Sequence, residues 1–183
     1  PASSLIERRN ARRDSLSERV NTAADLVNGD SDQWVMWCNL NSESEALAKA
    51  IPDAVELRGS DSEDEKERKI IAFLAGEIRV LVTKASIAGF GMNWQHCADT
   101  GFVGLNDSFE QVYQAVRRFW RFGQKHVVDV HYITADTEGA VLANIKRKYA
   151  DADRMYAGMI KNMQSLNKKT LREAAPPVAA PSA

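Results

Sequence analysis

Short, unbroken apolar runs separated by helical patterns constrain this chain most. Residues 34–39 read WVMWCN and residues 80–82 read VLV, without the polar alternation of a strand that faces water on one side. Such runs indicate strands that are covered on both faces. In all, strands are predicted at residues 34–39, 54–57, 79–82, 100–104 and 127–133. Strands that alternate with helices imply an α/β fold, a parallel sheet in a three-layer sandwich with right-handed crossovers.

Helix starts are predicted from three capping-box patterns, in which Ser is followed three residues later by Glu. The patterns are Ser15 with Glu18, Ser42 with Glu45, and Ser60 with Glu63. The helices that begin there are expected to end at Gly29, Pro52 and Gly76, because glycine and proline terminate helices. One further long helix, or two, is predicted over residues 136–166.

Length and composition allow one domain with tails. The chain has 183 residues, of which 44% are apolar, enough for one good core. We divide it into a basic arm and helix at residues 1–30, a core at residues 31–135, a helical extension at residues 136–170 and a disordered Ala/Pro-rich tail at residues 171–183. The arm carries Arg8, Arg9, Arg12 and Arg13, which either track phosphates or lie in solvent.

Net charge and cysteine content exclude several classes of protein. A net charge of −1 argues against general coating of nucleic acid, so any such contact must come from a local patch. Cys38 and Cys97 have neither metal-ligand spacing nor the density of a disulfide scaffold, which fits a reducing cytoplasm, and no metal site is predicted. No apolar run approaches the length of a membrane span, so we expect a cytoplasmic protein without membrane contact.

An arginine-rich segment at residues 114–124, QAVRRFWRFGQ, carries the strongest functional signal. As a helix, it would place cations on one face and apolar side chains on the other. The expected cationic face holds Gln114, Arg117, Arg118 and Arg121, and the apolar face holds Val112, Val116, Phe119 and Trp120. Guanidinium groups at this density suit the phosphates of a nucleotide, and the alternative is a solvated helix whose arginines pair with local carboxylates.

A loop of small residues precedes this segment. Residues 83–94, TKASIAGFGMNW, follow the apolar run at residues 80–82. Gly89 and Gly91 would let backbone amides approach a ligand closely, because glycine has no Cβ and tolerates positive φ. In parallel sheets, ligands gather at the carboxyl ends of strands, where this loop is expected to lie.

Together, the loop and the arginine segment resemble motifs V and VI of superfamily 2 helicases and translocases. Motif VI is most similar to the Swi/Snf type, Q-A-x-x-R-x-x-R-x-G-Q. The fixed positions are matched by Gln114, Ala115, Arg118, Arg121, Gly123 and Gln124. Gly89, Gly91 and Asn93 align with the second half of the family's motif V. The resemblance covers residues 33–135 and is to the second, C-terminal RecA-like lobe of such a motor, in a phage or prophage form.

The resemblance implies roles for particular residues. Arg118 and Arg121 would reach the triphosphate of ATP–Mg²⁺ from across a cleft, with Arg121 the first choice for the arginine finger. The nucleotide would also lie near Gly89, Gly91, Asn93 and Gln114. Contacts to a nucleic-acid backbone would come from Asn39, Gly59, Ser60, Thr83, Lys84 and Ser86. The implied partners are an N-terminal RecA-like lobe of the same polypeptide and nucleic acid. Double-stranded DNA is preferred, although the residues do not distinguish DNA from RNA.

The chain lacks the phosphate-binding half of an ATPase. No stretch matches G-x-x-x-x-G-K-[ST], and no D-E-x-H or D-E-A-D box is present. We therefore predict a second motor lobe that does not hydrolyse ATP alone. One alternative is a non-catalytic module that uses its arginines on nucleic acid or an acidic partner. Another is a Rossmann-like enzyme, which the absence of G-x-G-x-x-G after the first strand disfavours.

The four tryptophans give a direct check on these elements. Trp34, Trp37 and Trp120 lie on strand or helix faces that should be buried. Trp94 ends the glycine loop, and loops run over protein surfaces, so we expect it to be more exposed than the other three.

Overall fold

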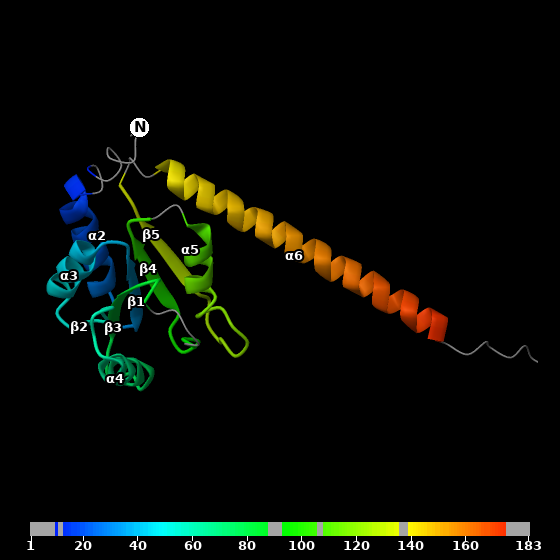
Figure 1. The fold of residues 1–183 in the computed structure, drawn as a ribbon, viewed down its shortest axis with the longest axis horizontal. Helices are drawn as coiled ribbons and strands as arrows, with labels where there is room; N and C mark the ends of the chain where they lie inside the picture. Colours follow the sequence, from blue (N-terminus) through cyan, green and yellow to red (C-terminus); the bar gives the residue numbers. More distant parts are fainter. Residues whose placement is uncertain (1–9, 11–12, 88–92, 106–107, 136–138, 175–183) are drawn as a thin grey trace, which may run out of the picture. The chain divides into compact units, whose positions relative to one another are not determined.

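The computed structural model contains a five-stranded, fully parallel sheet (Figure 1). It describes residues 10, 13–87, 93–105, 108–135 and 139–174, without the side chains of residue 156 and residues 159–174. The strands are β1 (Trp34–Cys38), β2 (Ala54–Glu56), β3 (Val80–Lys84), β4 (Asp99–Val103) and β5 (Asp129–Ile133), in the order β2-β3-β1-β4-β5. All five predicted strands are confirmed, and their ends move by only one or two residues.

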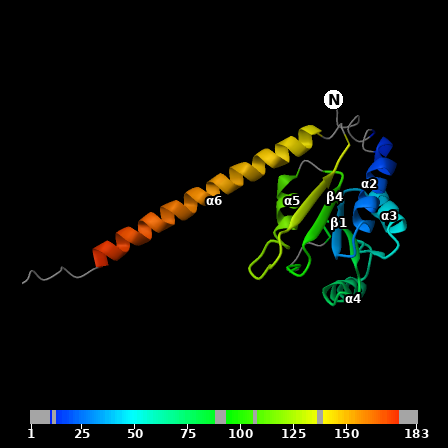
Figure 2. The same ribbon diagram turned by 180° about the vertical axis from the view of Figure 1, so that it is seen from behind.

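Helices flank the sheet on two sides. They are α2 (Leu16–Asn28), α3 (Asn41–Ala50), α4 (Glu63–Leu74) and α5 (Phe109–Val116), and a further helix, α6 (Gly139–Ala174), follows β5 along the chain. Helices α2 and α3 lie together on one side of the sheet and α5 lies on the other, as the front view (Figure 1) and the reverse view (Figure 2) both show. The predicted three-layer α/β sandwich is confirmed.

An aliphatic core lies between the sheet and helices α2 and α3. Successive side chains of a strand point to opposite faces, so Trp34, Met36 and Cys38 of β1 enter this core together. The helices contribute Val20, Ala23, Ala24, Val27 and Leu47, and Ile51 follows directly after α3. Because β1 is central and both of its faces are covered, every one of its residues is buried, which explains the unbroken apolar run.

The opposite face of the sheet carries an aromatic core. Trp37 of β1 packs against Trp94, Phe102 and Phe119, with ring centroids 5.4, 6.1 and 6.4 Å away. Phe73 of α4 lies edge-on to Trp94 at 6.0 Å. Trp34 and Trp37 are buried as predicted, but Trp94 is 0% exposed, so its expected exposure is wrong. The end of the glycine loop turns inward because the indole fills this aromatic core.

Both predicted helices exist, and the N-cap of α2 is Ser15 as predicted, but the predicted cap of α3 is wrong in position because its N-cap is Leu40 and not Ser42. Ser15 precedes α2 without a side-chain cap bond, and its hydroxyl instead accepts a hydrogen bond from Arg19 Nε. In α3 the cap carboxylate belongs to Glu43 and not to Glu45. Its Oε2 accepts hydrogen bonds from the backbone N–H groups of Asn39 and Leu40, at 3.0 and 2.9 Å.

Helix α4 begins two residues later than its predicted cap implies. Its N-cap is Ser62 and not Ser60, and the Ser62 hydroxyl accepts a hydrogen bond from the Glu65 backbone N–H at 3.2 Å. The helix ends predicted at Gly29, Pro52 and Gly76 are confirmed. Gly76 has a φ of 79°, in the left-handed region that favours glycine.

A buried ion pair joins α2 to α3, and no sequence pattern predicted it. Arg19 Nη1 lies 2.7 Å from Glu43 Oε1, and the two side chains are 2% and 0% exposed. Gly104 follows β4 with a φ of 73°, and a Cβ at this position would lie 2.7 Å from atoms of both side chains. The ion pair therefore requires glycine after β4, and its carboxylate holds the loop after β1.

The chain divides into two compact units, residues 1–145 and residues 146–183. The first unit contains the sheet and the start of α6, where Val141 and Ile145 are buried. In the second unit α6 runs to Ala174, four residues into the predicted tail, and residues 175–183 lie outside the described part of the chain. Arg8, Arg9 and Arg12 of the predicted basic arm also lie outside it, whereas Arg13 is exposed.

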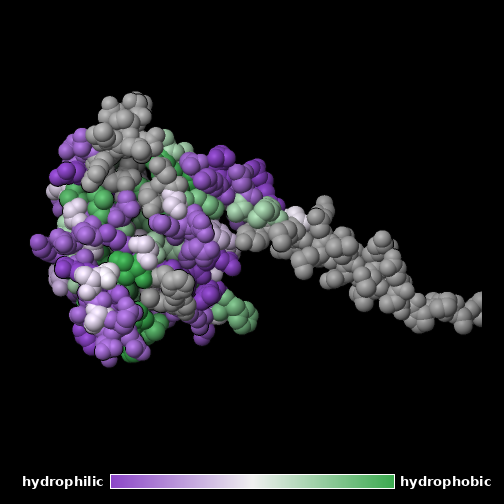
Figure 3. All heavy atoms as spheres, viewed as in Figure 1, coloured by the Kyte–Doolittle hydropathy of each residue, from purple (hydrophilic) through white to green (hydrophobic). Residues whose placement is uncertain are grey.

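The described residues offer neither a membrane span nor a metal site. None of their helices combines the length and the apolar character needed to cross a membrane. No three His, Cys, Asp or Glu side chains among them are placed to hold a metal ion. Cys38 and Cys97 are free and buried, and burial raises the pKa of the Cys97 thiol to about 12. The face drawn in Figure 3 is largely hydrophilic, with small hydrophobic areas between.

Candidate functional site

Only residues 114–116 of the arginine-rich segment belong to a helix, and turns follow, so the predicted helix over residues 114–124 is wrong beyond Val116. Helix α5 ends at Val116, and the backbone continues in turns, in which the Arg118 N–H donates to the Ala115 carbonyl at 3.2 Å. Phe119 is fully buried, but Trp120 is 58% exposed, so the predicted burial of Trp120 is wrong. A continuous helix would place Trp120 beside Val116 on the apolar face, and the turn directs it outward instead.

Arg118 is half-buried against two indole rings. Its Cζ lies 5.5 Å from the ring centroid of Trp37 and 5.9 Å from that of Trp94. The backbone carbonyl of Arg118 also accepts a hydrogen bond from the backbone N–H of Trp94 at 3.0 Å. Arg118 Nη1 and Trp94 Nε1 are buried and have no hydrogen-bond partner among the described residues. Burial, together with the nearby charge of Arg121, lowers the pKa of Arg118.

The other two arginines have different surroundings. Arg117 is exposed, and its Cζ lies 5.2 Å from the ring centroid of Trp120. Arg121 is also exposed, and its backbone N–H donates to the Phe119 carbonyl at 3.0 Å. The predicted single cationic face is therefore divided into one arginine in the aromatic core, one beside an exposed indole and one in solvent.

Gly123 and Gln124 close the turn that carries Arg121. Gly123 has a φ of 99°, and a Cβ at this position would lie 3.0 Å from Gln95 Oε1. The Gln124 side chain donates from Nε2 to the Cys97 carbonyl at 3.1 Å, and its backbone N–H donates to the Arg121 carbonyl at 3.1 Å. The final glycine and glutamine of the motif thus tie the arginine turn to residues 93–97, which precede β4.

Replacing Gly123 with alanine should destabilise the fold by about 1–2 kcal/mol, because an L side chain is strained at positive φ. Gly139→Ala is the matched control, since no heavy atom of the described residues lies within 4 Å of its added Cβ and its φ is not positive. We expect the control to be neutral or slightly stabilising. Urea unfolding of both variants measures the difference, and equal midpoints would contradict this account of Gly123.

The residues predicted to lie near the nucleotide are only partly brought together. Asn93 is exposed, and its Oδ1 accepts a hydrogen bond from the Gln95 backbone N–H at 3.3 Å. Gln114 is exposed on α5, and no hydrogen bond between its side chain and Arg118 or Arg121 occurs among the described residues. Gly89 and Gly91 lie outside the described residues.

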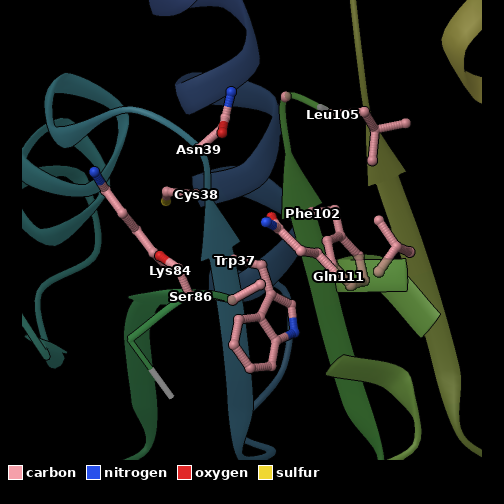
Figure 4. Close-up of a pocket in the computed structure, with 11 residues that line it drawn as sticks. Trp37, Cys38, Asn39, Lys84, Ser86, Phe102, Leu105 and Gln111 are labelled. Atoms are coloured by element: carbon pink, nitrogen blue, oxygen red, sulfur yellow. The ribbon is translucent and has the colours of Figure 1, made fainter. Parts of the chain in front are cut away.

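Two cavities lie at the carboxyl ends of the strands, between the loops that follow them. The smaller cavity, of about 40 Å³, has Trp37 and Phe102 as its aromatic wall (Figure 4). The larger cavity, of about 340 Å³, lies between the ends of β2 and β3 and the start of α3. Five of the six predicted nucleic-acid residues line one or both cavities: Asn39, Gly59, Ser60, Lys84 and Ser86.

Thr83 is the exception among the predicted nucleic-acid residues. Its side chain is fully buried, and its hydroxyl donates to the Leu57 carbonyl at 3.1 Å. This hydrogen bond joins β3 to the end of β2 and leaves the hydroxyl no access to a ligand. We therefore remove Thr83 from the expected contact set.

The larger cavity has a mixed charge, and sequence reasoning missed part of its lining. Arg58 Nη2 lies 2.6 Å from Glu56 Oε2, and the hydrogen bond to this carboxylate raises the pKa of Arg58. Ser44 donates its hydroxyl to the other oxygen of Glu56 at 2.7 Å. Lys84 is the second cation on the lining. Arg58 was missed, and the signal that could have indicated it was its position. It closely follows β2, at the edge of the sheet where the predicted residue Lys84 ends β3.

Comparison with known proteins identifies the fold. No protein-family model and no curated protein matches the sequence. The C-terminal domain of the DEAD-box protein Dbp5 is similar in structure, with a TM-score of 0.63 and 17% identity over 74% of this chain and 80% of that one. The C-terminal part of the Fun30 ATPase domain has a TM-score of 0.62 and 14% identity, over 69% of this chain.

A third similar structure is the RNA-helicase Prp28 from Chaetomium thermophilum bound to ADP, with a TM-score of 0.63 and 19% identity over 75% of this chain. The present chain spans 44% of the Fun30 chain and 35% of the Prp28 chain. The chain therefore has the RecA-like fold of helicase C-terminal domains, as predicted.

Proposed function

We propose that this chain is the second motor lobe of an ATP-dependent nucleic-acid helicase or translocase, of the Swi/Snf-like type found in phages and prophages. The observation that carries the proposal is the arginine turn. It holds Arg118 against two indoles, leaves Arg121 exposed and is closed by Gly123 and Gln124. These are the arginines and the closing residues of the helicase motif that the sequence resembles.

The environments of the two arginines fit a nucleotide bound across a cleft. Arg121 is exposed, so its planar guanidinium is able to bridge two phosphate oxygens of a ligand outside the domain. The buried Nη1 of Arg118 has no acceptor among the described residues, which fits a nearby anionic ligand. Arg121 is the proposed finger on the γ-phosphate, and Arg118 is the second arginine at the triphosphate.

The rest of the nucleotide site would come from a first RecA-like lobe outside this chain. Phosphoryl transfer needs a phosphate cradle and a magnesium site, and the sequence contains no G-x-x-x-x-G-K-[ST]. ATP and Mg²⁺ would thus bind mainly to the first lobe, with Asn93 and Gln114 near the nucleotide. Prp28, which has a similar fold, was solved with ADP.

Nucleic acid would bind at the carboxyl edge of the sheet. Asn39, Lys84 and Ser86 line the smaller cavity there, and Gly59 and Ser60 line the larger one. Their amide, ammonium, hydroxyl and backbone groups suit phosphate and sugar atoms and read no base sequence. The proposed track is double-stranded DNA.

The isolated chain should fold but not hydrolyse ATP, whereas the full-length protein should hydrolyse ATP and do so faster with nucleic acid. The sheet has covered faces and its own core, which supports folding, and the absence of a phosphate-cradle motif is the reason to expect no hydrolysis. Thermal melting and phosphate release measure both properties. Turnover by the isolated chain above that of an Arg121→Ala control would contradict the proposal. A full-length protein that binds nucleic acid without ATP turnover would favour the binding module.

A further inference from the structure

Arg118 lies in a cage made by two tryptophans from distant parts of the chain. Trp37 belongs to β1 and Trp94 to the segment before β4, and their ring centroids are 5.4 Å apart. Arg118 Cζ lies over both rings, at 5.5 and 5.9 Å from their centroids. Both indoles are buried, at 2% and 0% exposed.

The cage is anchored within the sheet. Trp37 Nε1 donates to the Thr100 hydroxyl at 2.8 Å, and that hydroxyl donates to the Val35 carbonyl at 2.8 Å. This chain of hydrogen bonds fixes the plane of the Trp37 ring between β1 and β4. Phe119, the residue after Arg118, packs edge-on against both indoles, at 6.4 and 5.5 Å. The ring positions are therefore set by the core and not by a ligand.

An aromatic cage differs from a carboxylate as a partner for arginine. The ring faces attract the guanidinium by cation–π interaction, which strengthens where water is excluded. They neutralise no charge and accept no in-plane N–H bond. No ion pair between Arg118 and a carboxylate occurs among the described residues, and its Nη1 has no acceptor there. The arginine is thus fixed in position without a carboxylate that would neutralise its charge.

We infer that Trp37 and Trp94 are positioning residues, which hold Arg118 at the place where it meets the nucleotide. This inference rests on the proposed motor function and adds to it the means by which one arginine is ordered. A carboxylate partner in this place would compete with the phosphates for the same N–H groups. The aromatic cage orders the side chain without that competition.

A double-mutant cycle in the full-length protein tests the cage. Trp37→Leu and Arg118→Gln should each lower kcat by about 10- to 100-fold, because small displacements of a positioning group have effects of this size. The double variant should be no slower than Arg118→Gln alone, since both changes remove the same arrangement. Trp37→Phe keeps an aromatic face and should recover most of the lost kcat.

Trp34→Leu is the matched control for stability. Trp34 lies in the same strand, is equally buried and faces the opposite core, where its ring centroid is 5.3 Å from that of His131. Below its melting temperature, Trp34→Leu should keep kcat within about twofold of the wild type. When it is combined with Arg118→Gln, the two fold-losses in kcat should multiply. If Trp37→Leu does not fold, Thr100→Val replaces it in the cycle, because it keeps both rings and removes only the anchor.

Several outcomes would overturn the cage. If the full-length protein is active and the kcat losses of the Trp37 and Arg118 variants multiply in the double variant, the positioning role of the cage is wrong and the proposed function still stands. The same holds for equal kcat losses in Trp34→Leu and Trp37→Leu, or for no rescue by Trp37→Phe. A full-length protein without ATP turnover, or a turnover that Arg118→Gln leaves unchanged, would overturn the proposed role of Arg118 and the cage with it. Melting curves of every variant separate these results from unfolding.

Discussion

Replacing Arg121 with lysine in the full-length protein should lower ATP turnover by about a thousandfold or more, with nucleotide affinity and folding nearly unchanged. Lysine keeps the positive charge but loses the planar fork that can bridge two phosphate oxygens in the transition state. Arg121 is exposed, so its replacement leaves no cavity in the core. Steady-state kcat, nucleotide Kd by equilibrium titration and a melting curve check the three parts of the expectation.

Arg117→Lys is the control for this substitution. Arg117 is also exposed, lies four residues earlier and stacks on Trp120, but it is not one of the fixed positions of the Q-A-x-x-R-x-x-R-x-G-Q pattern. Its replacement should be mild, because an exposed cation–π contact contributes only about 0.5–1 kcal/mol. If Arg117→Lys lost more activity than Arg121→Lys, the register of the motif would be wrong. If neither variant lost turnover, the binding module would become the better account.

The type of the sheet elements and their places along the chain could be predicted because strand signals are local. An apolar run such as residues 34–38 is buried on both faces wherever it lies in a parallel sheet, so few alternatives compete. The signals for helix ends, glycine and proline, are equally local. Helix starts were less certain, since Ser60 and Ser62, followed by Glu63 and Glu65, fit a capping box in two registers. Only Ser62 forms the cap bond.

The arginine segment shows why motif matching and helix geometry gave different results. The motif match points to Arg118, Arg121 and Gly123 whatever the shape of the backbone, and the role that it implies for them stays a prediction. The helical projection failed beyond Val116, where the chain turns toward a glycine with positive φ. Trp120 was consequently predicted to be buried, whereas it is exposed.

Contacts between residues far apart in the sequence could not be predicted from patterns. The cage joins Trp37, Trp94 and Arg118, which lie in separate parts of the chain, and Trp94 is buried because its indole packs in this aromatic core. The ion pair of Arg19 with Glu43 spans 24 residues and depends on how α2 and α3 pack. Periodicity identifies which faces of the helices and strands are apolar, but it does not identify which two buried charged side chains form an ion pair.

That ion pair gives the largest stability effect that we expect. Glu43→Gln should destabilise the fold by about 5 kcal/mol, because breaking a buried pair costs about 3–5 kcal/mol and an unpaired backbone N–H adds about 1–3 kcal/mol. The Glu43 carboxylate accepts from Arg19 and from the backbone of Asn39 and Leu40, at 2.7, 3.0 and 2.9 Å. A glutamine amide has one acceptor oxygen, so it cannot serve both sets of donors.

Urea unfolding measures this effect, with Glu45→Gln as the control two residues along the same helix. Glu45 is exposed, so its replacement should change the free energy of unfolding by less than about 0.5 kcal/mol. The double variant Arg19→Met with Glu43→Leu should be more stable than Glu43→Leu alone, because it buries no uncompensated charge. It should still be less stable than the wild type, since the N–H groups of Asn39 and Leu40 stay unpaired. A Glu43→Gln variant as stable as Glu45→Gln would show that the loop after β1, and Asn39 at the proposed nucleic-acid edge, is held by other contacts.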